Sequence, residues 1–177
     1  SFAVAATTNS SPAPMGGTFF SVQVPQDVLG TKLFGINANP ISLAQLKGKY
    51  VVLAPFLTSC QEICPMVSVN MLAISRAIMK AGLNNKAVAL EVSVDPDRDT
   101  PARIKAYQDL FGDYSWTIAS GDSANLKKFW KFFGAQATKM PYSKSEMNSI
   151  PADWQTGKKN TFDLRSEEHT SELQSHL

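Results

Sequence analysis

The stretch that decides the fold is residues 51–65, VVLAPFLTSCQEICP. Residues 51–57 are almost continuously apolar, which predicts a buried strand. Pro65 is favoured in the first turn of a helix, so a helix is predicted to begin there. The two cysteines of the chain, Cys60 and Cys64, therefore lie at a strand-to-helix junction.

The junction favours thiolate chemistry, because unpaired N–H groups and the helix dipole stabilise a negative charge at the start of a helix. Two thiolates separated by three residues can converge on one soft ion, and thiolate ligands favour Cu(I), zinc or iron–sulfur clusters. The chain has two cysteines and two histidines, His169 and His176, in a spacing that resembles no zinc finger or four-cysteine cluster. Copper, which needs fewer ligands, fits this inventory better. A structural disulfide or two buried thiols that only pack are the alternatives, although a bond closing so short a loop stabilises little.

Composition indicates one domain with a substantial core. The chain has 177 residues, of which 44% are hydrophobic and 18% charged. Its formal net charge is only +2. So small a net charge argues against a nucleic-acid partner.

Residues 1–17 change from small apolar residues to a Ser/Thr/Pro/Gly-rich composition. This composition predicts a flexible linker that follows an export signal or a membrane anchor. The first residues resemble the end of an export segment, and Ala3-Val4-Ala5 would suit a cleavage site. A disordered terminus is the simpler alternative. The sequence itself contains no apolar stretch long enough to span a bilayer.

The rest of the chain alternates strand-like and helix-like patterns, which predict an α/β sandwich with parallel crossovers. Apolar positions along the first long helix predict a buried stripe of Val67, Met71, Ile74 and Ile78. Strands are expected at 18–24, 32–36, 51–57, 87–94 and 116–119, a turn or short helix at 41–49, and helices at 65–81, 99–111 and 122–133.

Three motifs together resemble the SCO/SenC family of copper chaperones. They are LKGK at 46–49, CQEICP at 60–65 and SVDPDRDTP at 93–101, and the resemblance covers residues 18–163. It implies a thioredoxin-like fold with a central mixed sheet flanked by helices. It also implies a location in the periplasm or at the extracytoplasmic face of the cytoplasmic membrane.

The resemblance further implies that two cysteines and a later histidine bind copper, as Cu(I) or Cu(II), for the CuA centre of cytochrome c oxidase subunit II. Cys60 and Cys64 match the family's cysteine ligands. Asp95 matches its acidic residue near the metal loop, although a carboxylate beside a helix N-terminus is favourable in any case. A thioredoxin-like reductant is an expected partner, because copper loading requires reduced cysteines.

The match with the family ends near the C-terminus. The family continues with an aspartate-rich turn, a histidine and further strands, and residues 162–164 are expected to begin that turn. Residues 165–177 show no apolar alternation and are predicted to be a non-native tail, so the domain over 18–164 is expected to lack its C-terminal strands. His169 lies near the expected position of the copper ligand, and an exposed tail histidine is the alternative.

Two other thiol functions remain open at this stage. A thiol–disulfide reductase would use Cys60 as the attacking thiolate and Cys64 as the resolving thiol, although such motifs usually have two intervening residues. A peroxiredoxin-type peroxidase would use Thr58 to activate Cys60, but the spacing differs by one residue on each side of the threonine.

Overall fold

A five-stranded sheet forms the centre of the structure, a computed structural model that describes residues 23–61 and 63–166. The strand order is β2-β1-β5-β4-β3. The strands β3, β4 and β5 are parallel, whereas β1 runs antiparallel to β5 and to β2, so the sheet is mixed as predicted. The strands are β1 Leu33–Phe34, β2 Pro40–Ile41, β3 Tyr50–Phe56, β4 Ala87–Ser93 and β5 Thr117–Gly121.

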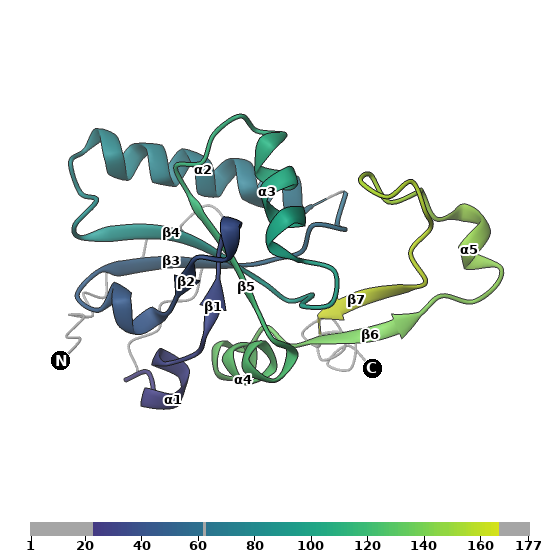
Figure 1. Cartoon of the computed structure of the whole chain (residues 1–177), viewed down its shortest axis with the longest axis horizontal. Coiled ribbons are helices and arrows are strands. Elements are labelled where there is room, and N and C mark those ends of the chain that lie inside the picture. The colour runs from purple at the N-terminus through teal and green to yellow at the C-terminus, as the bar shows by residue number, and fades with distance from the viewer. Residues whose placement is uncertain (1–22, 62, 167–177) are drawn as a thin grey trace, which may run out of the picture.

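Helices cover both faces of this sheet (Figure 1). Helices α2 (Cys64–Lys80) and α3 (Pro101–Asp109) lie over one face, and α1 (Gln26–Leu29) and α4 (Ser123–Phe133) lie over the other. The crossovers β3–α2–β4 and β4–α3–β5 join parallel neighbours, which confirms the predicted α/β sandwich. Two short 3₁₀ helices, Ile36–Ala38 and Leu43–Leu46, precede β3.

Strand β4 lies between two partners and is the most buried strand of the central sheet. Residues 89–93 are all buried, which explains the nearly continuous apolar pattern of this segment. Strand β3, in the described part of the chain, pairs only with β4. Its Tyr50 and Val52 are accordingly exposed at the edge of the sheet.

The buried stripe of α2 differs from the predicted one. Met71 is buried as expected, but Val67, Ile74 and Ile78 lie at its margins, and the fully buried positions are Ser68, Met71, Leu72 and Ser75. The two serines are tolerated because their hydroxyls donate to Glu91 and to the Ser115 carbonyl. Periodicity alone favoured the apolar neighbours and missed these polar core positions.

The caps of α3 and α4 agree with the sequence. Thr100 accepts a hydrogen bond from the Arg103 amide, and Asp122 accepts one from the Asn125 amide. Gly134, at φ 77°, ends α4 in the left-handed conformation. The predicted helices at 99–111 and 122–133 are thus confirmed, within one or two residues at each end.

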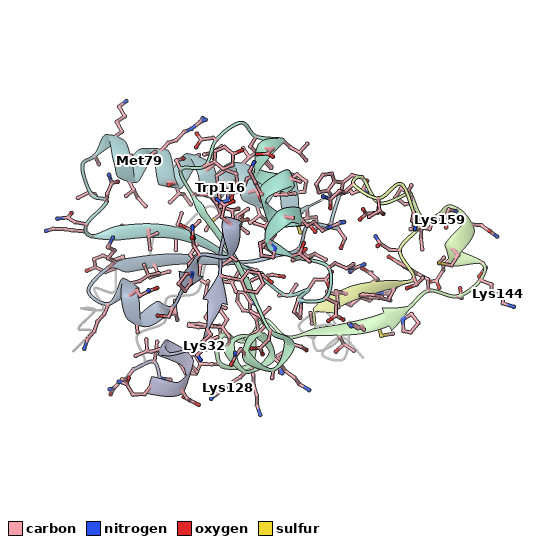
Figure 2. All side chains as sticks on the ribbon, viewed as in Figure 1. Lys32, Met79, Trp116, Lys128, Lys144 and Lys159 are labelled. Atoms are coloured by element: carbon pink, nitrogen blue, oxygen red, sulfur yellow. The ribbon has the colours of Figure 1, made fainter. Side chains whose placement is uncertain are left out.

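A second, two-stranded sheet extends from the central body (Figure 1). Strands β6 (Ala137–Pro141) and β7 (Phe162–Ser166) pair antiparallel, and α5 (Glu146–Ser149) lies in the connection between them. Lys144 and Lys159 mark the outer end of this region in Figure 2. The turn predicted at 162–164 is wrong, because backbone pairing with β6 holds these residues in β7.

The N-terminal prediction also needs correction. Gln23 and Val24, the described part of the strand expected at 18–24, are not in a strand, and the short helix α1 follows them. Residues 18–22 lie outside the described residues. No helix within 23–61 and 63–166 has the length and hydropathy needed to cross a bilayer.

Candidate metal centre

The two cysteines lie where β3 gives way to α2. Phe56, the last residue of β3, is fully buried and fixes the start of the loop. Cys60 lies in that loop, with its amide bonded to the Leu57 carbonyl at 3.3 Å, and Cys64 is the first residue of α2. Both thiols are half-buried, and no disulfide joins them in the described structure.

The two sulfurs are close enough to influence one another. The Cys64 amide donates to the Cys60 sulfur at 3.3 Å, so the N-terminus of α2 stabilises negative charge on Cys60. The pKa of Cys64 is raised, first by its hydrogen bond to Cys60 and then by burial. Two neighbouring sulfurs, one of which accepts a hydrogen bond from the first turn of α2, suit a soft cation.

Thr58, two residues before Cys60, is fixed by a buried polar network. Its amide and hydroxyl donate to one carboxylate oxygen of Asp99 at 3.1 and 2.5 Å, and its hydroxyl accepts from Arg103 Nε at 2.5 Å. The Thr58 hydroxyl thus donates its proton to Asp99. A peroxidase would need Thr58 to assist Cys60, whereas here the side chain holds the loop.

Arg103 also binds the segment 150–157, which lies some fifty residues further along the chain. Its guanidinium forms a two-pronged ion pair with Asp153, at 3.0 and 2.5 Å, and both side chains are buried. Trp154 beside it donates from Nε1 to the Thr58 carbonyl at 2.7 Å. We call Thr58, Asp99, Arg103, Asp153 and Trp154 the Arg103 cluster.

The carboxylates of this cluster differ in acidity. The hydrogen bonds from Arg103 hold the pKa of Asp153 well below its usual range. Burial raises the pKa of Asp99 to about 6, against the opposing hydrogen bonds from Ser93 and Thr58. Direct contact with a guanidinium distinguishes the first carboxylate from the second.

A second buried network lies on the face of the sheet that α2 and α3 cover. Glu91, in the middle of β4, accepts hydrogen bonds from Ser68 at 3.1 Å to each oxygen and from Trp116 Nε1 at 2.8 Å. Ser68 also shares a 3.1 Å hydrogen bond with Tyr107. These four residues are the Glu91 cluster, and Figure 2 labels its Trp116.

Glu91 is fully buried, and its side-chain hydrogen bonds come from neutral donors. Burial raises the pKa of Glu91 to about 7, more than the Ser68 and Trp116 hydrogen bonds lower it. Ser68 lies one helical turn after Cys64, so the cluster lies beneath the first turns of α2. Sequence analysis missed it, although one charged residue within the apolar run AVALEVSV was a visible signal.

Asp95 occupies a buried loop position after β4. Its Oδ2 pairs with Arg98, and its amide donates to the Ser93 hydroxyl at 2.8 Å. Its Oδ1 is buried and has no hydrogen-bond partner among the described residues. Burial raises the pKa of Asp95. The hydrogen bonds of Asp95 thus shape the loop that carries Asp99, and a role at the metal stays a prediction.

The third ligand predicted from the sequence cannot be placed, because His169 lies outside the described residues, as does His176. Within the described part of the chain, no group of three or more His, Cys, Asp or Glu side chains is arranged to hold a metal ion. The described metal donors at this site are therefore the two thiols, which fit a soft cation of low coordination number.

The comparisons with known proteins agree with this geometry. The family described as SCO1/SenC matches residues 32–152. Among solved structures, the chain is similar to ScoI of Bradyrhizobium japonicum with copper bound, at 26% identity and a TM-score of 0.57. That match covers 83% of this chain and 97% of the other. Comparison with curated proteins gives no match.

Two further structures share the fold at lower identity. A SCO1/SenC family lipoprotein from Bacillus anthracis strain Ames is 21% identical, with a TM-score of 0.56, over 81% of this chain and 90% of that chain. Apo Sco1 of Thermus thermophilus is 24% identical, with a TM-score of 0.53, over 77% and 71%. These likenesses confirm the predicted thioredoxin-like α/β fold.

Proposed function

The chain belongs to the SCO1/SenC family, and from this premise we propose that it is a copper-binding metallochaperone with Cys60 and Cys64 as the ligands of its cargo. The observation that carries the proposal is the pair of reduced, half-buried thiols at the start of α2, with the Cys64 amide on the Cys60 sulfur. Copper bound to the similar ScoI of Bradyrhizobium japonicum supports it.

The destination of the copper that fits this family is the CuA centre of cytochrome c oxidase subunit II, at the extracytoplasmic face of the membrane. Copper would pass by ligand exchange, as the thiolates of the acceptor replace Cys60 and Cys64 one at a time. Partial exposure of both cysteines suits such an exchange, because an incoming thiolate must reach the metal. In this proposal His169 supplies the third ligand.

Competition with a chromophoric chelator for Cu(I) tests the proposal. The reduced protein is expected to bind one Cu(I), and Cys60→Ser or Cys64→Ser is expected to reduce the affinity by at least a hundredfold. Affinity should also fall between pH 7 and pH 5, because protons compete with the metal for thiolates. His169→Ala tests the third ligand separately through the affinity for Cu(II).

Met66→Leu is the matched control, since Met66 is an exposed sulfur residue on the same helical turn. It should bind Cu(I) as the unchanged chain does. Absence of Cu(I) binding by the reduced protein, or binding that survives both serine substitutions, would contradict the proposal.

Thiol–disulfide exchange is the second candidate. It is favoured by the hydrogen bond between the two thiols, which places them close enough to act as attacking and resolving groups. Turnover of a disulfide substrate by the metal-free protein, lost in Cys60→Ser, would support this activity.

A further inference from the structure

The cysteine loop receives hydrogen bonds from the segment 150–157 on both sides of Cys60. Two residues before the cysteine, the Thr58 carbonyl accepts from Trp154 Nε1 at 2.7 Å. One residue after it, Gln61 Nε2 donates to the Ala152 carbonyl at 3.1 Å. These contacts join positions more than ninety residues apart in the chain and place Cys60 between two fixed points.

The segment 150–157 is itself attached to the body of the protein through Arg103. The ion pair between Arg103 and Asp153 is buried, and the Arg103 guanidinium carbon lies 5.4 Å from the centre of the Trp154 ring. Asp153 also caps its own turn by accepting from the amides of Gln155 and Thr156. The ring of Trp154 packs edge-on against Tyr107 at 6.3 Å.

Arg103 connects the two ends of this arrangement. One of its nitrogens binds the Thr58 hydroxyl, and two others bind Asp153. Thr58 and Asp153 bind the same guanidinium. A displacement of the segment 150–157 should therefore displace Thr58 as well. Because a loop that is already ordered loses less entropy on binding, such fixation favours metal capture.

We propose that Arg103 and Trp154 are positioning residues of the cysteine site: they fasten the segment 150–157 to Thr58 and Gln61 and thereby hold Cys60 opposite Cys64. This inference rests on the proposed function only where it predicts a change in the affinity for copper. The arrangement of the loop can be measured in the metal-free chain.

The test is Trp154→Phe, which keeps an aromatic ring and removes the N–H donor. Its matched control is Trp130→Phe, because Trp130 Nε1 donates to the Ser93 carbonyl at 2.8 Å on the opposite face of the sheet. Both variants lose one indole hydrogen bond to a backbone carbonyl. Amide hydrogen exchange of residues 58–61 is measured in the reduced, metal-free full chain, together with the global stability of each variant.

Trp154→Phe is expected to speed exchange in residues 58–61 by two- to tenfold, the effect of losing one hydrogen bond. Trp130→Phe is expected to leave exchange there unchanged at a similar loss of global stability. Equal exchange in the two variants would overturn the proposal, because the effect would then be general destabilisation.

Gln61→Ala offers a second test that does not disturb the core, since Gln61 is exposed. It should speed exchange at the same residues and should lower the affinity for Cu(I) by two- to tenfold in the chelator competition. If the unchanged chain binds no Cu(I), the proposed function fails while the exchange data still decide the positioning role. If exchange in residues 58–61 is unaltered in both Gln61→Ala and Trp154→Phe, the positioning role is wrong whatever the copper result.

Discussion

The Arg103 cluster and the Glu91 cluster both bury carboxyl groups beside the cysteine site, but the pKa values of Asp153 and Glu91 shift in opposite directions. Asp153 meets a guanidinium at two nitrogens, and its pKa is held well below the usual range. Glu91 meets only neutral donors, and burial raises its pKa to about 7. Burial alone therefore does not set the pKa of these carboxyl groups. The two-pronged contact with Arg103 outweighs burial at Asp153, whereas burial outweighs the contact with Arg98 at Asp95.

Asp99, also in the Arg103 cluster, shows the effect of burial without contact with the guanidinium. It binds two hydroxyls and an amide rather than the guanidinium, and burial raises its pKa to about 6. Ionised Asp153 fixes the segment 150–157, whereas Glu91 changes charge near neutral pH. The first cluster is thus a fixed support for the cysteine loop, and the second makes the stability of the domain depend on pH.

The largest expected effect comes from Arg103→Gln, which leaves Asp153 buried without its cation. We expect a loss of about 3–5 kcal/mol in the free energy of unfolding at pH 7. The depressed pKa of Asp153 stabilises the native chain above its ordinary value of 3.8, and this contribution is lost as pH falls through the folded value. The difference between variant and native chain should therefore shrink below pH 3.8.

Urea unfolding at pH 7 and at low pH measures this difference. Arg76→Gln is the matched control, because Arg76 pairs with Asp113 at the surface, with 59% of the Arg76 side chain exposed. It should change stability far less. Equal losses in the two variants would show that burial of the ion pair does not matter.

The next effect is expected from Glu91→Gln. A carboxyl group whose pKa rises from 4.5 to about 7 on folding binds more protons in the native state, so native stability falls as pH rises between these values. The glutamine variant lacks this slope. The free energy of unfolding of Glu91→Gln, relative to that of the native chain, should therefore rise with pH. The difference should be near zero at pH 4.5 and about 3 kcal/mol above pH 7.

Unfolding free energies of both chains at pH 5 and pH 8 check this prediction. If the two stability curves run parallel between these pH values, Glu91 does not carry the titration assigned to it. The contrast between an ionised Asp153 and a Glu91 that titrates near neutral pH would then be wrong.

A smaller effect is expected from Ser68→Ala, which removes a hydroxyl that donates to both Glu91 oxygens. Hydrogen bonds to a charged acceptor contribute more than those to a neutral one, by about 1 kcal/mol. The variant should therefore lose more stability at pH 8 than at pH 5. The same loss at both values would indicate a packing effect alone.

The smallest effect is expected at an exposed ion pair. Lys105 and Asp109 lie 3.0 Å apart on the surface of α3, and about half of each side chain is exposed. Lys105→Ala should change the free energy of unfolding by no more than about 0.5 kcal/mol. A loss as large as that of Arg103→Gln would mean that contact with a cation stabilises equally in and out of the core.

Sequence patterns predicted most of the central sheet and its helices. Apolar runs marked β3 and β4, and the caps Thr100 and Asp122 marked the starts of α3 and α4. The errors lie where polar residues are buried or where pairing is distant. Sequence periodicity missed Ser68 and Ser75 on α2. The turn predicted at 162–164 rested on the family resemblance, whereas these residues pair with β6 as part of β7.

The sequence by itself determined that Cys60 and Cys64 lie between a buried strand and a helix, because apolar periodicity and Pro65 act over a few residues. The tertiary structure alone decided what surrounds them. Arg103 meets Asp153 fifty residues away, and Trp154 reaches the Thr58 carbonyl across ninety-six. Local patterns fix which elements form, whereas packing of the elements fixes which polar groups meet, and each buried polar group must find its partner there.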